Sequence, residues 1–236
     1  MREGIVVVNK PPGITSHDVV QLLRHKLGMR RIGHGGTLDP MASGILVLLI
    51  GGATKHQRAV QAHRKRYEAV IRLGIQTDTA DACGQVLHTA SVPPVTHEHV
   101  TAVLASCTGP FTQVPPAFSA VKVQGRPLYW WARRGRRLAA RPRRVEVFAI
   151  ELLEFRGDQL RCRIECSAGT YIRTLAETIA GRLGTVGHVS ELTRLSVGHW
   201  HFAHALDLGW LARASLEEIW ACVQPAEDLH ACADRT

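Results

Sequence analysis

The side chains best placed by type and spacing to do chemistry lie in one loop without hydrophobic periodicity. Residues 33–44 read Gly-His-Gly-Gly-Thr-Leu-Asp-Pro-Met-Ala-Ser-Gly, with four glycines and one acid, Asp39. Glycines let a backbone approach a ligand closely, and a carboxylate there can act as a nucleophile or a base. The loop lacks the Gly-Lys-Ser/Thr ending of a P-loop and the spacing of a dinucleotide fingerprint. The residues alone leave open that Asp39 only starts a turn with Pro40.

Cysteine and histidine give weaker signals. The six cysteines include no Cys-x-x-Cys pair. Cys162 and Cys166 alternate with charged residues, as in a half-buried strand, so we expect core thiols rather than zinc ligands or disulfides. The thirteen histidines include two local clusters, at 97–99 and 199–204, and neither has the spacing of an HExxH helix. We expect no metal and no cofactor.

Length and composition indicate a globular protein with a packed core. The chain has 236 residues, of which 45% are hydrophobic and 21% charged. No apolar run approaches the roughly 18 residues of a membrane span. The apolar run near the start, 5–8, is too short for a signal-peptide core. We therefore expect a cytoplasmic protein.

Positive charge is concentrated in one stretch. The net charge is +9, and residues 126–144 contain eight arginines and no acid. Focused positive charge favours a polyanion such as RNA; the alternative is a solvated loop in an arginine-rich proteome. The candidate RNA-binding residues are Arg126, Arg133, Arg134, Arg136, Arg137, Arg141, Arg143 and Arg144.

Hydrophobic patterning predicts strands and helices in irregular alternation. Thr15 and Asp18 form a capping-box pattern before a helix that Gly28 would end. The expected strands cover 5–8, 45–50, 67–73, 145–155 and 160–166, and further helices are expected near Val100, near Ile172 and after Ser215. This mixture favours an α+β fold over a βαβ series.

Residues 33–44 resemble the active-site signature of the TruB-type tRNA pseudouridine synthases, bacterial enzymes that isomerise uridine 55 of the tRNA T loop. Other motifs of that family occur in order, so the likeness runs from about residue 5 to 200. They are Asn9-Lys10-Pro11-x-Gly13, Lys65-Arg66-Tyr67, Thr77-Asp78-Thr79-x-Asp81-x-x-Gly84, Pro115-Pro116-x-x-Ser119-Ala120-x-Lys122, Gly169-Thr170-Tyr171-Ile172-Arg173 and Leu192-Thr193-Arg194.

The resemblance implies a fold and a reaction. The fold would be the pseudouridine synthase fold, a mixed and mostly antiparallel sheet with flanking helices and a central RNA-binding cleft. Uridine and pseudouridine are isomers, so the reaction needs no cofactor. Asp39 would be the catalytic residue, either attacking C1′ or removing a proton from C2′, and Arg173 would be its cationic partner. From the residues alone, Arg173 is a surface charge at a helix start.

The resemblance also implies a set of substrate-binding residues. His34 would assist the base flipping that exposes C1′ and C5, and Tyr67 would stack on the uracil. Tyr171 and Leu192 would line the uracil pocket. Without the family likeness, His34 is a turn residue and Tyr67 a core aromatic at a strand start.

The arginine-rich stretch falls where the family carries an insertion that closes on the T loop, here about residues 115–144. We expect residues 1–205 to form the catalytic domain and 206–236 a short acidic tail rather than a full PUA-like RNA-binding domain. The expected partner is the T-arm of tRNA, bound by a monomer without an obligatory protein partner. Two alternatives stay open: an RNA-binding or RNA-folding module without catalysis, and a pseudouridine synthase acting on another RNA.

Overall fold

A computed structural model describes residues 3–226 and divides the chain into two compact units. Unit 1 is Met1–Tyr67 with Thr193–Thr236, and unit 2 is Glu68–Leu192. Two strands, β4 (Lys65–Leu73) and β12 (Gly187–Val197), carry the chain from one unit into the other. The strands form a mixed sheet of ten and two small two-stranded sheets, with helices between them. The expected α+β fold is confirmed.

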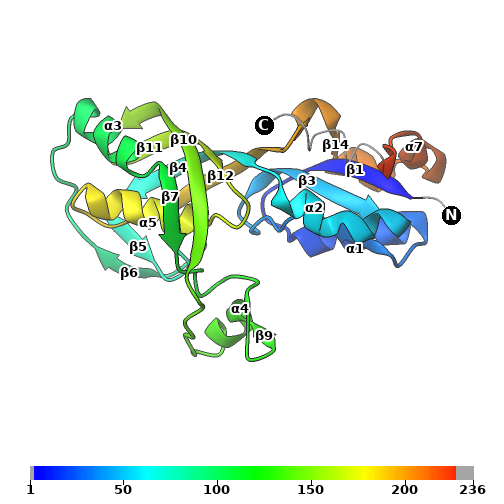
Figure 1. Ribbon diagram of the computed structural model, residues 1–236, viewed down its shortest axis with the longest axis horizontal. Coiled ribbons are helices and arrows are strands. Elements are labelled where there is room, and N and C mark those ends of the chain that lie inside the picture. The colour runs from blue at the N-terminus through cyan, green and yellow to red at the C-terminus, as the bar shows by residue number, and fades with distance from the viewer. Residues whose placement is uncertain (1–2, 227–236) are drawn as a thin grey trace. The chain divides into compact units, whose positions relative to one another are not determined.

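Unit 1 is built around a central antiparallel pair (Figure 1). Strand β1 (Gly4–Lys10) pairs with β3 (Ser43–Ile50) along its whole length and with β14 (Ala205–Asp207) in parallel. Strand β2 (Ile32–His34) pairs antiparallel with β3. The other elements of the unit are α1 (Ser16–Leu27), η1 (Gly51–His56), α2 (Gln57–Ala62), β13 (Trp200–His201), η2 (Phe202–His204), α6 (Leu208–Arg213) and α7 (Leu216–Ala221).

Helix α1 follows its sequence signals. The Thr15 side chain accepts from the Asp18 amide at 3.1 Å, and the Asp18 carboxylate accepts from the Thr15 amide at 2.8 Å, which completes the predicted capping box. Gly28 ends the helix in the left-handed region, at φ +62°. The buried face of α1 includes Leu23 and Leu27, and the helix contacts β2 and α6 of unit 1.

The core of unit 1 lies between its strands and the segments that cover them. It consists of fully or nearly fully buried apolar side chains, which removes their surface from water. Its members include Ile5, Val7, Ile45, Val47, Leu49, Val60, Val197 and Trp200. Because these side chains come from β1, β3, α2, the end of β12 and β13, the core fixes strand β3, into which the loop after β2 leads.

Unit 2 contains the long predicted hairpin. Strands β10 (Arg143–Arg156) and β11 (Gln159–Cys166) pair antiparallel around the turn at 157–158, and β10 also pairs with β7 (Gly109–Gln113). Cys162 and Cys166 are fully buried, as their alternation predicted. The remaining elements are β5 (Ile75–Thr77), β6 (Val86–Thr89), α3 (His97–Ser106), β8 (Lys122–Val123), β9 (Arg126–Pro127), α4 (Leu128–Ala132) and α5 (Ile172–Arg182).

Some features were not expected from the sequence. Strand β12 was missed, because its buried positions include His188 and Arg194 and so break the apolar pattern. The expected acidic tail holds α6 and α7 within 206–226, and its residues 227–236 lie outside the described part. The boundary expected at residue 205 stays a prediction. No helix within residues 3–226 is long and apolar enough to cross a membrane.

Candidate active site

Asp39 lies in the loop that joins β2 to β3, and the residue before it is fixed to helix α1. Asp39 is half-buried, whereas Leu38 is buried. The Ser16 hydroxyl donates to the Leu38 carbonyl at 3.1 Å and accepts from the Leu38 amide at 2.8 Å. Because Ser16 is the first residue of α1, a rigid helix holds the backbone next to Asp39.

The residue after Asp39 is held from β1 and the turn that follows it. The Pro40 carbonyl accepts from the Gly13 amide at 2.8 Å and from the Lys10 ammonium at 3.4 Å. Lys10 is fully buried and also donates to the carbonyls of Pro11 and Ile14, each at 2.8 Å. All three ammonium protons therefore have acceptors, as a buried charge requires.

Arg194 holds the other side of the loop. It lies on β12 beside β3, with Arg194 opposite Gly44, and only 2% of it is exposed. Its Nε donates to the Ile45 carbonyl at 2.7 Å, and its two terminal nitrogens donate to the carbonyls of Thr37 (3.2 Å) and Gly36 (3.1 Å). A side chain at Gly44 would collide with the Arg194 backbone, and the φ of Gly44 is +104°, so this close approach needs glycine.

The charges around Asp39 affect one another. Burial lowers the pKa of Lys10 to about 8; the negative charge of Asp39 opposes that shift and the positive charge of Arg194 adds to it. Burial also lowers the pKa of His34, as do the charges of Arg194 and His17. The His34 Nδ1 accepts from the Gly36 amide at 3.4 Å. His34 is therefore neutral at pH 7 and can contact a base without adding charge.

Tyr67 lies at the start of β4, and it is 9% exposed. This burial fits the aromatic core position that its strand pattern indicates. Two residues earlier, the buried Lys65 donates to the carbonyls of Gln61 and His63. These carbonyls lie at the end of α2, so Lys65 joins that helix to the strand that carries Tyr67.

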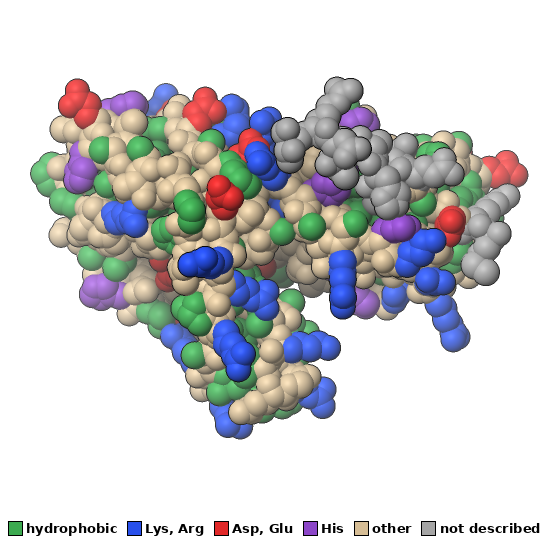
Figure 2. Space-filling view, in the orientation of Figure 1, with side chains coloured by type: hydrophobic (Ala, Val, Ile, Leu, Met, Phe, Trp, Pro, Cys, Tyr) green, Lys and Arg blue, Asp and Glu red, His purple; other side chains and the backbone are tan. Residues whose placement is uncertain are grey.

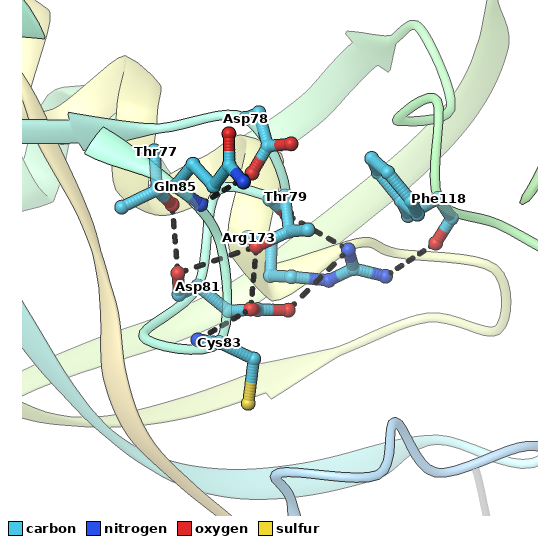
Figure 3. A network of polar contacts seen from close by, with 8 residues as sticks. All are labelled: Thr77, Asp78, Thr79, Asp81, Cys83, Gln85, Phe118 and Arg173. Carbon is cyan, nitrogen blue, oxygen red and sulfur yellow. Dashed lines mark hydrogen bonds and ion pairs between the residues drawn. The ribbon is translucent and has the colours of Figure 1, made fainter. Parts of the chain in front are cut away.

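In unit 2, Arg173 is a buried charge within a network of polar groups (Figure 3). It is only 3% exposed, so the interpretation as a surface helix charge is wrong. Its guanidinium donates to the carbonyls of Thr79 and Phe118, each at 2.9 Å, and lies 3.6 Å from the Asp81 carboxylate. The predicted pairing of Arg173 with Asp39 stays a prediction, because the two residues belong to different units.

The turn that holds Asp81 is fixed in detail. One carboxylate oxygen of Asp81 accepts from the Thr79 hydroxyl at 2.6 Å and from the Cys83 amide at 3.0 Å, and the other faces Arg173 (Figure 3). Thr77 donates to the Asp81 carbonyl at 2.7 Å. The hydrogen bonds within the motif 77–84 therefore fix the Asp81 carboxylate opposite Arg173. This negative charge offsets part of the cost of burying the Arg173 guanidinium.

Tyr171 and Leu192 also belong to unit 2. Tyr171 is the N-cap of α5 and half-buried. The Gln113 amide group binds both of its main-chain polar groups, with Tyr171 N to Gln113 Oε1 at 2.9 Å and Gln113 Nε2 to Tyr171 O at 3.2 Å. Leu192 lies on β12 and is 7% exposed. The uracil contacts expected of Tyr171 and Leu192 stay predictions.

All eight candidate RNA-binding arginines are exposed. Figure 2 shows Lys and Arg side chains gathered on the segment that holds β9 and α4, which projects from the body of unit 2 (Figure 1). Arg134 lies 3.7 Å from the centre of the Trp130 ring and Arg126 lies 5.4 Å from it. Arg136 lies 4.8 Å from the Trp131 ring. Contact with an indole ring orders these guanidinium groups, and Arg134 also donates to the Trp130 carbonyl at 3.2 Å.

The residues whose side chains fix the main chain around the candidate site residues could not be identified from the sequence. Ser16 lay inside a predicted helix, and Gln113 stood in no motif. Arg194 belongs to the Leu192-Thr193-Arg194 motif, which by itself indicates no role for it. The motif was the only signal for Arg194, because a buried guanidinium that binds main-chain carbonyls has no pattern of its own in a sequence.

Comparisons with known proteins agree with this geometry. A profile of the TruB family pseudouridylate synthases (N-terminal domain) matches residues 24–172. The chain is 44% identical to tRNA pseudouridine synthase B of Opitutus terrae over 92% of this chain and 90% of that protein. It is 41% identical to the enzyme of the same name from Francisella philomiragia, over 96% of this chain and 75% of that protein.

The likeness extends to solved structures. The fold matches a chain in the crystal structure of a Cbf5–Nop10–Gar1 complex with a TM-score of 0.73 and 30% identity, covering 96% of this chain and 61% of that chain. The present chain thus spans about three fifths of that solved chain. The family profile, the two relatives and the match over nearly the whole fold lead to one conclusion: this chain belongs to the TruB family of pseudouridylate synthases.

Proposed function

We propose that this protein is a tRNA pseudouridine synthase that converts uridine 55 in the T loop into pseudouridine. The N1–C1′ bond of the uridine breaks, the uracil turns, and C5 bonds to C1′. The proton on C5 leaves and N1 takes one up, so atoms balance without a donor or a cofactor. The relatives named tRNA pseudouridine synthase B support the choice of tRNA as the substrate.

Asp39 is the proposed catalytic residue. Its carboxylate either attacks C1′ or removes the C2′ proton, and both routes need the target nucleotide flipped out of its stack. His34, neutral at pH 7, contacts the flipped-out nucleotide, and Tyr67 stacks on the uracil. Tyr171 and Leu192 line the uracil pocket, and Arg173 provides the positive charge that favours an ionised Asp39.

One observation carries the proposal most directly. The half-buried Asp39 sits in a loop that is hydrogen-bonded on both sides, next to two buried cations, Lys10 and Arg194. Burying charge is costly, so a module that only binds RNA gains nothing from placing cations in the interior around one carboxylate. A catalytic carboxylate gains a fixed position, which lowers the cost of reaching the reactive geometry.

The arginine-rich segment is the proposed contact with the T-arm. Its exposed guanidinium groups and stacked indoles suit phosphate contacts together with stacking on bases or riboses. We propose that the protein acts in the cytoplasm as a monomer, without an obligatory protein partner.

The test is to incubate the protein with an unmodified tRNA transcript and to map pseudouridine at every uridine by carbodiimide modification and primer extension. A transcript with cytidine at position 55 is the control. We expect modification at position 55 alone, and none in the control. Modification only at another uridine would support a synthase with a different target. Tight binding without modification would support a non-catalytic RNA-binding module.

A further inference from the structure

The loop that carries Asp39 has a hydrogen-bond donor on each carbonyl oxygen from residue 36 to residue 40. The first two carbonyls accept from Arg194 and the third from the Ser16 hydroxyl. The last two accept from the main-chain amides of Ala42 and Gly13. In exposed loops many main-chain carbonyls are hydrogen-bonded to water instead of to protein groups. The protein donors on all five carbonyls therefore restrict this loop more than is usual.

The two side chains that hold residues 36–38 come from distant and rigid elements. Ser16 opens α1, 22 residues before Leu38, and Arg194 lies on β12, more than 150 residues after Thr37. Each is buried, Ser16 to 2% exposure and Arg194 also to 2%. The position of the loop is therefore set by the core of unit 1 rather than by its own sequence.

Arg194 is suited to this task by its shape. Its planar fork reaches three carbonyls at once, of Gly36 and Thr37 in the loop and of Ile45 in the strand that follows it. A lysine ammonium has three donors on a single nitrogen, so it cannot place them at the three separate positions that the guanidinium nitrogens occupy. The guanidinium thus fixes the segment just before Asp39 relative to β3.

We infer that Arg194 and Ser16 are positioning residues for the reaction, which hold the Asp39 carboxylate in its reactive position without contacting the substrate. This inference rests on the proposed catalytic role of Asp39. A misplacement of about 1 Å can slow a reaction by about 100-fold. Loss of either side chain should therefore slow the chemical step and leave the affinity for RNA unchanged.

The test compares Ser16→Ala and Arg194→Lys with wild type and with Ser190→Ala. Ser190 is the matched control, because its hydroxyl also donates to a carbonyl, that of Val70 at 3.1 Å, from the same strand as Arg194 but outside the Asp39 loop. We expect the single-turnover rate of pseudouridine formation to fall about 10- to 100-fold in the first two variants. The Kd for tRNA should stay within about twofold in all three.

A second pair of measurements separates positioning from general damage to the fold. Methylguanidinium added to Arg194→Ala should restore part of its rate and should leave Ser16→Ala unchanged. Hydrogen exchange at the main-chain N–H groups of Gly36 and Ala42 should speed up at least tenfold in the variants. Neither Ser16 nor Arg194 is hydrogen-bonded to these two N–H groups, which donate to His34 and Asp39. The exchange readout needs no activity, so it tests the inference even if wild type modifies no uridine, an outcome that would refute the proposed function separately.

The inference is wrong if Ser16→Ala and Arg194→Lys react at the wild-type rate, or if their loss of rate is matched by an equal loss of affinity. It is also wrong if exchange at Gly36 and Ala42 stays as slow as in wild type. If the Arg194 variants do not fold, Ser16→Ala alone decides, because a serine-to-alanine change leaves helix α1 its first residue and its Thr15 cap.

Discussion

Arg173 and Asp81 form a deeply buried ion pair, with both side chains less than one tenth exposed. The distance of 3.6 Å is long for a salt bridge, and two carbonyls share the guanidinium. Asp81 therefore has an electrostatic role as well as a geometric one. Its negative charge lowers the free-energy cost of burying the Arg173 guanidinium.

Asp81→Asn removes that charge and keeps the shape. The amide oxygen can still accept from Thr79 and Cys83, whereas the amide nitrogen would face the Arg173 guanidinium. We expect the free energy of unfolding to fall by about 2 to 3 kcal/mol, because Arg173 keeps its carbonyl acceptors but loses the negative charge of Asp81. Pseudouridine formation should slow as well.

Asp78→Asn is the matched control for this change. Asp78 lies in the same turn and accepts from the Gln85 amide at 2.8 Å, an interaction that asparagine retains (Figure 3). Urea unfolding should place Asp78→Asn within about 0.5 kcal/mol of wild type. Equal stability of the Asp81 variant and this control would contradict the proposed electrostatic role.

Lys10 makes stability depend on pH. Its pKa is lowered by burial from 10.5 to about 8, so between these values the unfolded chain binds more protons than the folded one. The free energy of unfolding then rises with pH over this window, because the cost of burying the charge disappears. Below about pH 8 Lys10 is protonated in both the folded and the unfolded chain, so its contribution to the free energy of unfolding no longer changes with pH.

The measurement is chemical unfolding of wild type and Lys10→Met from pH 7 to 10.5. The stability of wild type relative to the variant should be flat up to about pH 8 and should then increase toward pH 10.5. The comparison cancels the titration of the other groups. A difference that is constant over the whole range, or that decreases above pH 8, is incompatible with a depressed lysine pKa.

Single residues were the hardest part to predict from sequence. The motif around Asp39 located the candidate site, whereas the buried state of Lys10, Arg173 and Arg194 could not be seen, because charged residues normally indicate surface. Their acceptors are main-chain carbonyls, which every residue has, so the sequence carries no sign of the pairing. Only the folded chain shows why these charges are tolerated.

The arginine-rich segment around β9 and α4 belongs to unit 2, whereas Asp39 and the groups that hold its loop belong to unit 1. Its arginines are exposed and stack on their own tryptophans. Phosphate contacts release counterions, so they add to affinity and to its dependence on salt but not to specificity or bond breaking. The segment should therefore affect binding of tRNA and not the chemical step.

The double variant Arg137→Gln/Arg141→Gln tests this separation. The slope of log Kobs against log salt should become shallower by about 0.7 to 0.9 for each lost phosphate contact. The rate at saturating enzyme should not change. The control is Arg156→Gln/Arg163→Gln, two arginines of the same unit that pair with Glu154 and Glu151. An unchanged slope in the first variant, or a similar change in the control, would refute the assignment.

Elements with local signals were predictable, and those without were not. The capping box of α1, its glycine end and the β10–β11 hairpin depend on near neighbours, so the sequence shows them. Strand β12 lacks a clear apolar alternation, since Arg194 is buried on it. Its place is set by pairing with β3, a contact about 150 residues away along the chain.

At the scale of the whole molecule, the predicted site residues are drawn from both units. Asp39, His34 and Tyr67 belong to unit 1, and Tyr171, Arg173 and Leu192 to unit 2. The family likeness covers both units, which explains why the overall fold class and the family could be recognised from ordered motifs. The proposed function needs the whole chain, because the proposed isomerisation of a T-loop uridine by means of Asp39 draws on residues of both units.

The most direct test of that claim is release of tritium from 5-tritiated uridine in full-length tRNA and in a T-arm hairpin, with wild type and Asp39→Asn. Tritium leaves only when C5 bonds to C1′, so release reports the isomerisation itself. Wild type should release one equivalent per T loop. Asp39→Asn should bind the RNA with a Kd within about threefold of wild type and release tritium more than about 1,000-fold more slowly. Release by Asp39→Asn within tenfold of the wild-type rate, or no release by wild type from RNA that it binds, would contradict the proposed function of Asp39 and of the protein.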